Sequence, residues 1–414
     1  MATRRSAAAG QRSGETVALV LAGGGARGAY ELGVLSVLAP VLEARGERLQ
    51  VLVGTSVGAL NAAYLGASAH LPLVAAIRKA EDLWRSMRYR DVLSPLLSLR
   101  ELGRAARYLG ELAGVPGASV SSLLDPAPLR ATLEHAIDFG QLEANVASGS
   151  VKTIAVVATS FATSRSVVFH RGGVTPPVDD IRAIDYVPVS LGEAHVRASA
   201  AIPGLFPAVE VDHPKGYAGW YADGGTRLNA PLQPALAFGA ERVIVIGMNS
   251  SSTAGHAARH RPDAIDGAAQ LAQIVLADQL TDDVDTLASI NETLMATSST
   301  TTSATPGSVP QHRRIPYVFV SPPDRFTIGR LAVAVYQRHY SGLRGLVRSR
   351  DLVLLAEIMN AERSPIHGEL LSYLFFAPEF IDALVEQGRR DARRWIEVQH
   401  DDGPWRYGRW RDAH

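Results

Sequence analysis

Val53-Gly54-Thr55-Ser56-Val57-Gly58-Ala59 places a serine between two glycines, where an apolar segment meets a helix-forming run. Residues 49–53 are short and apolar, as in a buried strand, and residues 59–65 carry the small and apolar side chains of a helix packed on it. In this setting a Gly-x-Ser-x-Gly turn holds the serine in a strained conformation and projects its hydroxyl above the sheet edge. Ser56 is therefore the candidate nucleophile, with Gly54 and Gly58 as the glycines of the turn. Outside such a setting the pentapeptide is only a tight turn that contains a serine.

A glycine-rich loop precedes this motif. Residues 16–22 are typical of an apolar strand, which runs into Gly23-Gly24-Gly25-Ala26-Arg27-Gly28, and a helix is expected over residues 29–45. Together with the strand at 49–53 this is a βαβ unit, whose right-handed crossover makes the two strands parallel. Both following loops then emerge at the carboxyl edge of the sheet, where open α/β sheets bind ligands. Backbone N–H groups of such a loop, beside a nucleophilic serine, form an oxyanion hole.

The same loop also spells Gly-x-Gly-x-x-Gly, the dinucleotide fingerprint. That fingerprint needs a carboxylate at the end of the second strand to bind the ribose. Here the second strand ends at Ser56, and Glu43 and Glu47 lie in the preceding helix and loop. A nucleotide triphosphate loop is excluded because no Gly-Lys-Ser/Thr follows the glycines. The sequence therefore predicts no cofactor.

A carboxylate at another strand end is the candidate base. Residues 219–222 are typical of a short strand and lead into Asp223, Gly224 and Gly225. An aspartate in water has a pKa of about 3.9 and is a feeble base, but burial beside a sheet edge raises that pKa. Asp223 is then able to take the serine proton. Taken by itself, an Asp-Gly-Gly sequence is equally well explained as a turn.

Four blocks in a fixed order carry a family resemblance. They are Gly23-Gly-Gly-Ala-Arg27-Gly28-Ala-Tyr30, Gly54-Thr-Ser56-Val-Gly58-Ala-Leu-Asn61, Ala198-Ser-Ala-Ala-Ile-Pro-Gly-Leu-Phe-Pro207, and Asp223-Gly-Gly225 with Asn229 and Pro231. Together they resemble the patatin-like phospholipases over residues 16–250. Residues 368–393 also resemble the carboxyl-terminal helices of bacterial members.

The resemblance implies a patatin-like three-layer α/β/α fold with a central, mostly parallel sheet and added C-terminal helices. It also implies a Ser–Asp dyad without a catalytic histidine, in which Ser56 is the nucleophile and Asp223 the base. The site residues that it implies further are the oxyanion-hole amides around Gly23, Gly24, Gly25, Arg27 and Gly28, and the base-loop residues Gly224 and Gly225. The reaction would be hydrolysis of a fatty acyl ester through an acyl-enzyme.

Two other functions stay open. An α/β-hydrolase has a Ser-Asp/Glu-His triad with the histidine last, and seven histidines follow Asp223, none in an obvious strand-end loop. The other is a lipid-binding or regulatory module that kept the fold and lost the chemistry, although Ser56, Asp223 and the glycine loop are all intact. His256 and His260 have a metal-ligand spacing but lack the adjacent glutamate of a zinc hydrolase helix, and the chain has no cysteine. No metal is predicted.

The domain prediction is one α/β domain with helical additions. Residues 1–14 are expected to be a disordered lead, 15–325 the patatin-like α/β hydrolase domain, 326–400 a C-terminal helical extension packed on the core, and 401–414 a loosely held tail. Further strands are expected at 153–159, 242–248 and 316–320. The Ser/Thr-rich residues 296–313 predict a flexible loop, and the last helices are expected at 327–345, 349–361 and 377–397.

Charge and hydropathy limit the classes of partner that the sequence predicts. The 41 basic residues balance the 41 acidic ones, so no nucleic-acid partner is predicted. Residues 85–107 are rich in arginine interleaved with apolar side chains, which makes them either a surface for anionic lipid headgroups or an ordinary solvated surface. No apolar run reaches 18 residues. The predicted partner is a lipid or acyl-ester substrate, and the predicted location is cytoplasmic with peripheral membrane contact; the oligomeric state is left open.

Overall fold

A nine-stranded sheet forms the centre of the molecule, with β5-β4-β3-β2-β1-β8-β9 as its main order. The computed structural model describes residues 14–96, 122, 124–248, 280–300, 313–359, 365–398 and 402–409. The strands are β1 (Val17–Leu21), β2 (Leu49–Thr55), β3 (Thr153–Ser160), β4 (Ser166–Gly172), β5 (Ile184–Pro188), β6 (Val209–Val211), β7 (Gly219–Asp223), β8 (Arg242–Ile246) and β9 (Tyr317–Val320).

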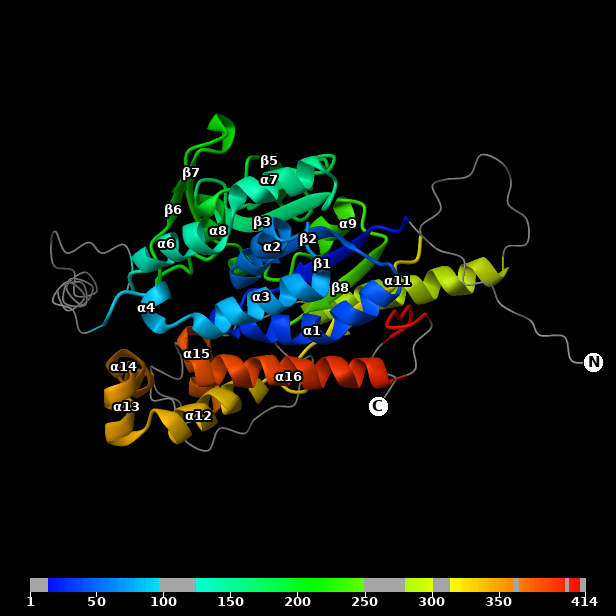
Figure 1. The fold of residues 1–414 in the computed structure, drawn as a ribbon. Coiled ribbons are helices and arrows are strands. Elements are labelled where there is room, and N and C mark those ends of the chain that lie inside the picture. Colours follow the sequence, from blue (N-terminus) through cyan, green and yellow to red (C-terminus); the bar gives the residue numbers. More distant parts are fainter. Residues whose placement is uncertain are drawn as a thin grey trace, which may run out of the picture.

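Helices surround this sheet (Figure 1). They are α1 (Gly28–Ala44), α2 (Val57–Ala67), α3 (Leu73–Ser86), α4 (Tyr89–Val92), α6 (Ala127–Ala136), α7 (Phe139–Ala147), α8 (Glu193–Ser199), α9 (Leu232–Ala237), α11 (Leu280–Thr300), α12 (Thr327–His339), α13 (Gly342–Arg348), α14 (Arg350–Ile358), α15 (Pro365–Leu374) and α16 (Pro378–Glu397). None of these described helices combines the length and hydropathy that crossing a bilayer requires.

The parallel strands at the centre follow from buried apolar segments joined by helices. Strand β1 lies between β2 and β8 and is parallel to both, and β2–β3 and β8–β9 are parallel as well. Every residue of β1 and β8 is buried, as expected for strands that are covered on both faces. Helix α2 packs on β2 and β3, and α9 packs on β1 and β2. This confirms the predicted three-layer α/β/α fold with a mostly parallel sheet.

Strands β2 and β7 meet end to end along β3. Thr55, the last residue of β2, pairs with Val157 of β3, and Asp223, the last residue of β7, pairs with the next residue, Ala158. Because β2 is parallel and β7 antiparallel to β3, their carboxyl ends point toward each other. This junction brings the residue after Thr55 next to Asp223, although the two lie far apart in the sequence.

The C-terminal helices lie below the sheet in the view of Figure 1, on the side of α1. Helix α16 runs alongside α1, and α12 and α15 lie next to it (Figure 1). The contact between α1 and α16 is close because Gly33 and Gly388 carry no side chain: a Cβ on Gly33 would lie 2.1 Å from the Val385 carbonyl oxygen. The glycine pair therefore lets the two helix backbones approach each other.

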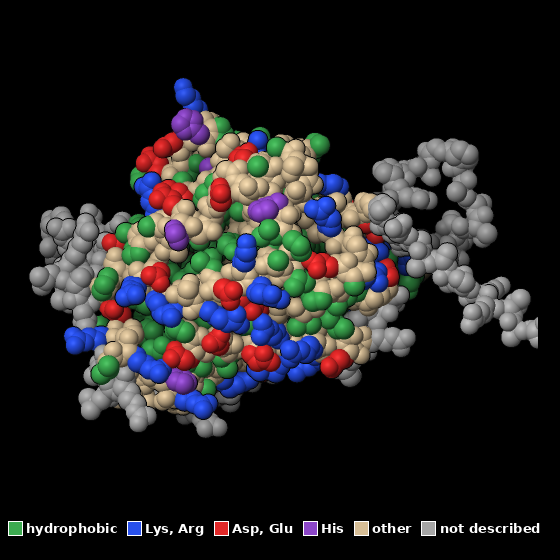
Figure 2. Space-filling model, viewed as in Figure 1, with side chains coloured by type: hydrophobic (Ala, Val, Ile, Leu, Met, Phe, Trp, Pro, Cys, Tyr) green, Lys and Arg blue, Asp and Glu red, His purple; other side chains and the backbone are tan. Residues whose placement is uncertain are grey.

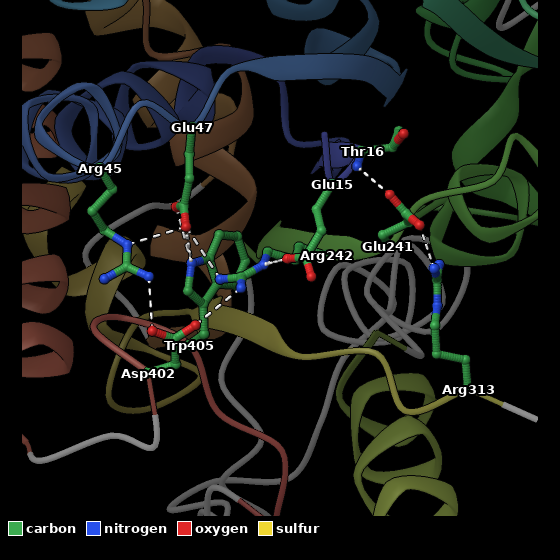
Figure 3. A network of polar contacts seen from close by, with 9 residues as sticks. All are labelled: Glu15, Thr16, Arg45, Glu47, Glu241, Arg242, Arg313, Asp402 and Trp405. Atoms are coloured by element: carbon green, nitrogen blue, oxygen red, sulfur yellow. Dashed lines mark hydrogen bonds and ion pairs between the residues drawn. The ribbon is translucent and has the colours of Figure 1, made fainter. Parts of the chain in front are cut away.

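The end of the described chain is firmly held, in contrast to the loosely held tail that the sequence suggested. Trp405 is fully buried, and its Nε1 donates to Glu47 at 3.0 Å. Arg242, at the start of β8, forms ion pairs with Glu15, with Glu47 at 3.1 Å and with Asp402 at 2.9 Å (Figure 3). We call these five residues the chain-end cluster. Residues 402–409 are held there because Glu47 accepts from Trp405 and Arg242 pairs with Asp402.

Several element boundaries differ from expectation. The helix expected at 327–345 is two helices, α12 and α13, separated at Tyr340 and Ser341, and α11 extends through Thr300 into the predicted flexible loop. Strands β4, β5 and β6 lie in segments for which no strand was expected. The lead at 1–13 and the loop at 301–312 lie outside the described residues.

Candidate active site

Ser56 has the strained backbone that a nucleophile elbow requires. Its φ is 54° and its ψ is −122°, a positive-φ conformation that side-chain-bearing residues rarely adopt. The turn is tight enough to demand glycine on both sides. A Cβ on Gly54 would lie 2.1 Å from the Gly58 carbonyl oxygen, and one on Gly58 would lie 2.3 Å from the Leu21 carbonyl oxygen. Ser56 thus stands between the end of β2 and the start of α2, as the motif predicted.

Ser199 holds the backbone of this elbow. The Ser56 amide donates to Ser199 Oγ at 2.9 Å, and that hydroxyl donates to the Val157 carbonyl at 2.5 Å. Ser199 is fully buried at the end of α8. It lies in a block that the resemblance quoted, but no local pattern marked it as a site residue, because its role depends on a turn of the chain far away in sequence.

Asp223 is a buried carboxylate, 1% exposed, that ends β7. Its Oδ1 accepts from the Gly225 amide at 2.7 Å. A Cβ on Gly224 would lie 2.3 Å from the Val157 carbonyl oxygen, so this turn also needs a glycine. Burial raises the pKa of Asp223 to about 6, against the smaller lowering effects of the Ser56 hydroxyl and the Gly225 amide.

The side chains of Ser56 and Asp223 lie near each other but do not form a hydrogen bond of ordinary geometry. The serine hydroxyl is near enough to favour the ionised carboxylate, whereas Asp223 Oδ2 has no hydrogen-bond partner of ordinary length and angle among the described residues. Hydrogen bonds between catalytic groups are often long until substrate binds. Asp223 therefore has a buried oxygen available on the side of the nucleophile.

The glycine loop packs directly against the nucleophile. A Cβ on Gly23 would lie 3.1 Å from Ser56 Cβ and 2.5 Å from Asn229 Oδ1. The Gly23 amide donates to the Asn229 backbone at 3.3 Å and to its Oδ1 at 3.1 Å. Asn229 thereby ties the loop to the chain that follows Asp223.

The loop amides divide into two groups. Those of Arg27 and Gly28 donate to the carbonyls of Gly24 and Gly25 in a short 3₁₀ turn, and Gly23 donates to Asn229. The amides of Gly24 and Gly25 have no acceptor within the described part of the chain, and the same holds for the Val57 amide, which follows the nucleophile. These three amides are therefore available to bind an anionic oxygen.

The Arg27 side chain is 1% exposed and reaches α15. Its guanidinium donates to Glu369 Oε2 at 2.6 Å and to Ser372 Oγ at 2.8 Å, and it lies 4.0 Å from the centre of the Tyr373 ring. These contacts fix the glycine loop to α15.

An apolar pocket opens beside Ser56. Apart from Gly25 and Ser56, its lining is Val57, Leu60, Trp84, Met87, Val92, Leu129, Leu133, Val196, Ala200, Ile202, Phe206, Tyr373, Leu374 and Phe376. Phe206 and Ile202 belong to the 198–207 block on which the family resemblance rests. A pocket of this composition suits a hydrocarbon chain.

A hydrogen-bond chain connects the pocket to the helices behind the nucleophile. Trp84 Nε1 donates to Asn61 Oδ1 at 2.9 Å, and Asn61 Nδ2 donates to Glu31 Oε2 at 2.7 Å and to the Gly28 carbonyl at 3.1 Å. Burial raises the pKa of Glu31 well above its usual range. Asn61 stood in a quoted block, but Glu31 and Trp84 resembled ordinary helix residues in the sequence.

No described histidine is hydrogen-bonded to Ser56 or Asp223, and none lines the pocket. His195 lies on α8, where it packs edge-on to Phe169 with ring centres 4.9 Å apart, and burial lowers its pKa to about 4. Of the histidines weighed for a triad, His339 and His367 are described, and His256, His260, His312, His400 and His414 lie outside the described residues.

Known proteins were compared with the chain. Residues 19–236, more than half of it, match the family model of the patatin-like phospholipases. VipD from Legionella pneumophila is 16% identical with a TM-score of 0.29, covering 74% of this chain and 62% of its own. Human GIVD cytosolic phospholipase A2, solved in complex with methyl γ-linolenyl fluorophosphonate, is 12% identical with a TM-score of 0.31, covering 92% of this chain and 60% of its own.

The chain thus spans about three fifths of the length of either solved protein, and TM-scores this low add nothing to the assignment. No curated protein matches the chain. The family model covers the end of β1, the glycine loop, the elbow and Asp223, and the assignment rests on it. The chain belongs to the patatin-like phospholipase family.

Proposed function

We propose that this chain is a serine lipid acyl hydrolase in which Ser56 is the nucleophile and Asp223 the base. The family supports a lipid acyl hydrolase in general terms. The observation that carries the finer proposal is the junction of β2 and β7, which sets a strained serine beside a buried carboxylate at the mouth of an apolar pocket.

The first step is attack of Ser56 Oγ on the ester carbonyl carbon. Asp223 takes the hydroxyl proton, the C–O bond of the ester breaks, and the alcohol leaves with that proton, so that an acyl-serine remains. Water then attacks the acyl-serine, again giving its proton to Asp223. The proton passes to Ser56 as the fatty acid is released. A pKa of about 6 makes Asp223 a far better proton acceptor than a solvated aspartate.

The amides of Gly24, Gly25 and Val57 are the proposed oxyanion donors. They lie beside Ser56 at two chain turns and lack acceptors among the described residues. A preorganised donor aimed at the developing charge is worth about 10²–10³ in rate. Within the predicted set of loop residues, the proposal therefore favours Gly24 and Gly25 over the amides of Gly23, Arg27 and Gly28.

The proposed substrate is a phospholipid or another fatty acyl ester met at a lipid surface. The apolar pocket supports an acyl chain as the bound group. In residues 87–92, Met87 and Val92 line the pocket while Arg88 and Arg90 are exposed. This arrangement supports contact of cationic side chains with anionic headgroups near the pocket. The remainder of the predicted basic segment, 97–107, lies outside the described residues.

The test compares wild type, Ser56→Ala and Asp223→Asn on nitrophenyl esters of graded chain length and on mixed phospholipid vesicles. A fluorophosphonate probe followed by peptide mapping locates the nucleophile. We expect turnover by wild type only, and labelling only at Ser56. Activity that survives Asp223→Asn but is lost on changing a histidine would favour a triad. Absence of both turnover and label would leave a lipid-binding module as the better account.

A further inference from the structure

One wall of the pocket comes from outside the segment that the family model covers. Tyr373, Leu374 and Phe376 line the pocket, whereas the family match ends at residue 236. These three residues lie at the end of α15 and in the turn before α16. We call them the C-terminal wall.

The C-terminal wall is fixed to the glycine loop through buried contacts. Arg27 and Glu369 form an ion pair at 2.6 Å with side chains 1% and 4% exposed, and Arg27 also donates to the Glu369 carbonyl at 2.7 Å. Gly25 adopts a φ of 59°, and a Cβ there would lie 2.2 Å from the Tyr373 carbonyl oxygen. These contacts therefore fix the position of the C-terminal wall relative to the glycine loop and its proposed oxyanion amides.

An aromatic pair makes this wall rigid. The rings of Phe376 and Trp84 stack with centres 6.5 Å apart and 17° between their planes. Trp84 is itself held by Asn61. The free space in the pocket is about 50 Å³, enough for only a few water molecules. An acyl chain that needs more than this volume fits only if a side chain that lines the pocket moves.

We infer that the C-terminal wall, through Phe376 and Leu374, sets the acyl chain length that the pocket accepts. The inference rests on the proposed function of Ser56 and its pocket. Phe376 and Leu374 are specificity-determining residues here and take no part in bond making. Shortening Phe376 lengthens the pocket, and enlarging Leu374 shortens it.

The experiment measures kcat/KM on esters of graded acyl length for wild type, Phe376→Leu, Leu374→Phe and Phe375→Leu. Phe375→Leu is the matched control, because Phe375 is fully buried in the same turn but packs against Tyr340 and Phe380 and does not line the pocket. One methylene in an apolar pocket changes selectivity by about tenfold or more. The ratio of kcat/KM for the longer over the shorter ester is expected to rise by about tenfold in Phe376→Leu, since the change frees at least that much space.

Leu374→Phe is expected to shift the ratio toward shorter esters, and Phe375→Leu to keep the wild-type profile. Thermal unfolding identifies any variant that fails to fold, in which case the oppositely directed variant decides. An unchanged profile in a folded Phe376→Leu or Leu374→Phe protein overturns the inference while leaving the hydrolase proposal intact. A wild type that neither hydrolyses any ester nor takes a fluorophosphonate label overturns both.

Discussion

At the scale of single residues, the site depends on two costly features that lie side by side. Ser56 holds a positive φ, and such strain is of the order of 1–3 kcal/mol. Asp223 is a buried carboxylate, and no lysine or arginine of the described residues forms an ion pair with it. A cation in contact with Asp223 would lower its pKa and make it a weaker base. A site without such a cation is therefore consistent with the proposed role of Asp223 as the base.

The pKa of Asp223 predicts the acid limb of activity. Because burial raises that pKa to about 6, the carboxylate is protonated below pH 6 and cannot accept the Ser56 proton. We expect kcat/KM on a neutral ester to fall about tenfold per pH unit below that value. The contribution of Asp223 to the free energy of unfolding should change with pH in the opposite direction. The unfolded aspartate ionises at about pH 4, so the contribution of Asp223 is largest below pH 4 and is lost as the pH rises to 6.

Ester hydrolysis from pH 4 to 8 and urea unfolding over the same range test both parts. In Asp223→Asn, the part of the pH dependence of the unfolding free energy that Asp223 causes should be absent. An acid limb centred near pH 4 would contradict the raised pKa.

Ser199 gives a prediction about positioning. In Ser199→Ala the Ser56 amide loses its acceptor inside the protein, a loss of about 1 kcal/mol. We expect kcat to fall by roughly fivefold to tenfold on that account, with little change in KM, because the pocket is untouched. Steady-state kinetics measure the split. Ser148→Ala, at the exposed end of α7, is the control and should behave as wild type. A rise in KM at constant kcat would point to a role in binding instead.

Sequence could predict Ser56 and Asp223 because each lies directly after an apolar strand and beside glycines that serve a local turn. Ser199, Glu31 and Trp84 have no such local mark. Their partners come from other elements, and only the assembled fold brings those elements together.

At the scale of elements, the buried ion pair of Arg27 and Glu369 helps to attach α15 to the glycine loop. Glu369 binds Arg27 and also accepts from the Gly329 amide of α12 at 2.5 Å. A Cβ on Gly329 would lie 2.4 Å from Glu369 Oε1, so the two helices can approach this closely only at a glycine. Glu369 therefore joins three elements, η1 (Gly25–Arg27), α12 and α15.

Glu369→Gln is expected to lower the free energy of unfolding by about 3 kcal/mol, because it removes one charge from the buried ion pair with Arg27. Urea unfolding gives the difference. Glu134→Gln is the control, since Glu134 pairs with Arg130 on the surface, with side chains 51% and 61% exposed; its loss should cost below about 1 kcal/mol. Equal effects of the two variants would mean that burial does not strengthen the Arg27 pair.

The elements that sequence predicted best are those with long apolar runs, such as β1, β3 and β8. Strand β6 was not predicted because it has three residues, and the central one, Glu210, is exposed. The break between α12 and α13 was not predicted because Tyr340 and Ser341 are not strong helix breakers. Tyr340 instead is buried against Phe375, which is a tertiary contact.

At the scale of the whole molecule, the chain-end cluster closes the edge of the sheet opposite to the site. Both the site and the cluster belong to the same parallel strands, at their carboxyl and amino ends respectively. Figure 2 shows basic and acidic side chains interspersed over the face that α1, α3 and α16 present, in keeping with the zero formal charge. We propose that the helices from 327 to 397 and the end segment 402–409 are part of one folding unit with the sheet.

Trp405→Ala is expected to destabilise the protein by about 3–5 kcal/mol, because it empties a fully buried indole site and removes a donor to Glu47. Trp220→Ala is the control: Trp220 is 53% exposed, and a surface change of this kind stays within about 0.5 kcal/mol. Thermal and urea unfolding measure both. A small effect at Trp405, equal to that at Trp220, would show that the end segment is held weakly.

The chain-end cluster also has a consequence for synthesis. Glu15 and Glu47 leave the ribosome early, Arg242 in the middle, and Asp402 and Trp405 last. At typical rates of translation the interval between Arg242 and Trp405 lasts roughly 10–30 s. During it, the nascent chain carries a sheet edge without its indole and, until residues 373–376 emerge, a pocket without its C-terminal wall. We expect such a chain to bind chaperones until Trp405 emerges, and to acquire its selectivity for acyl chains only once the C-terminal wall has packed against the pocket.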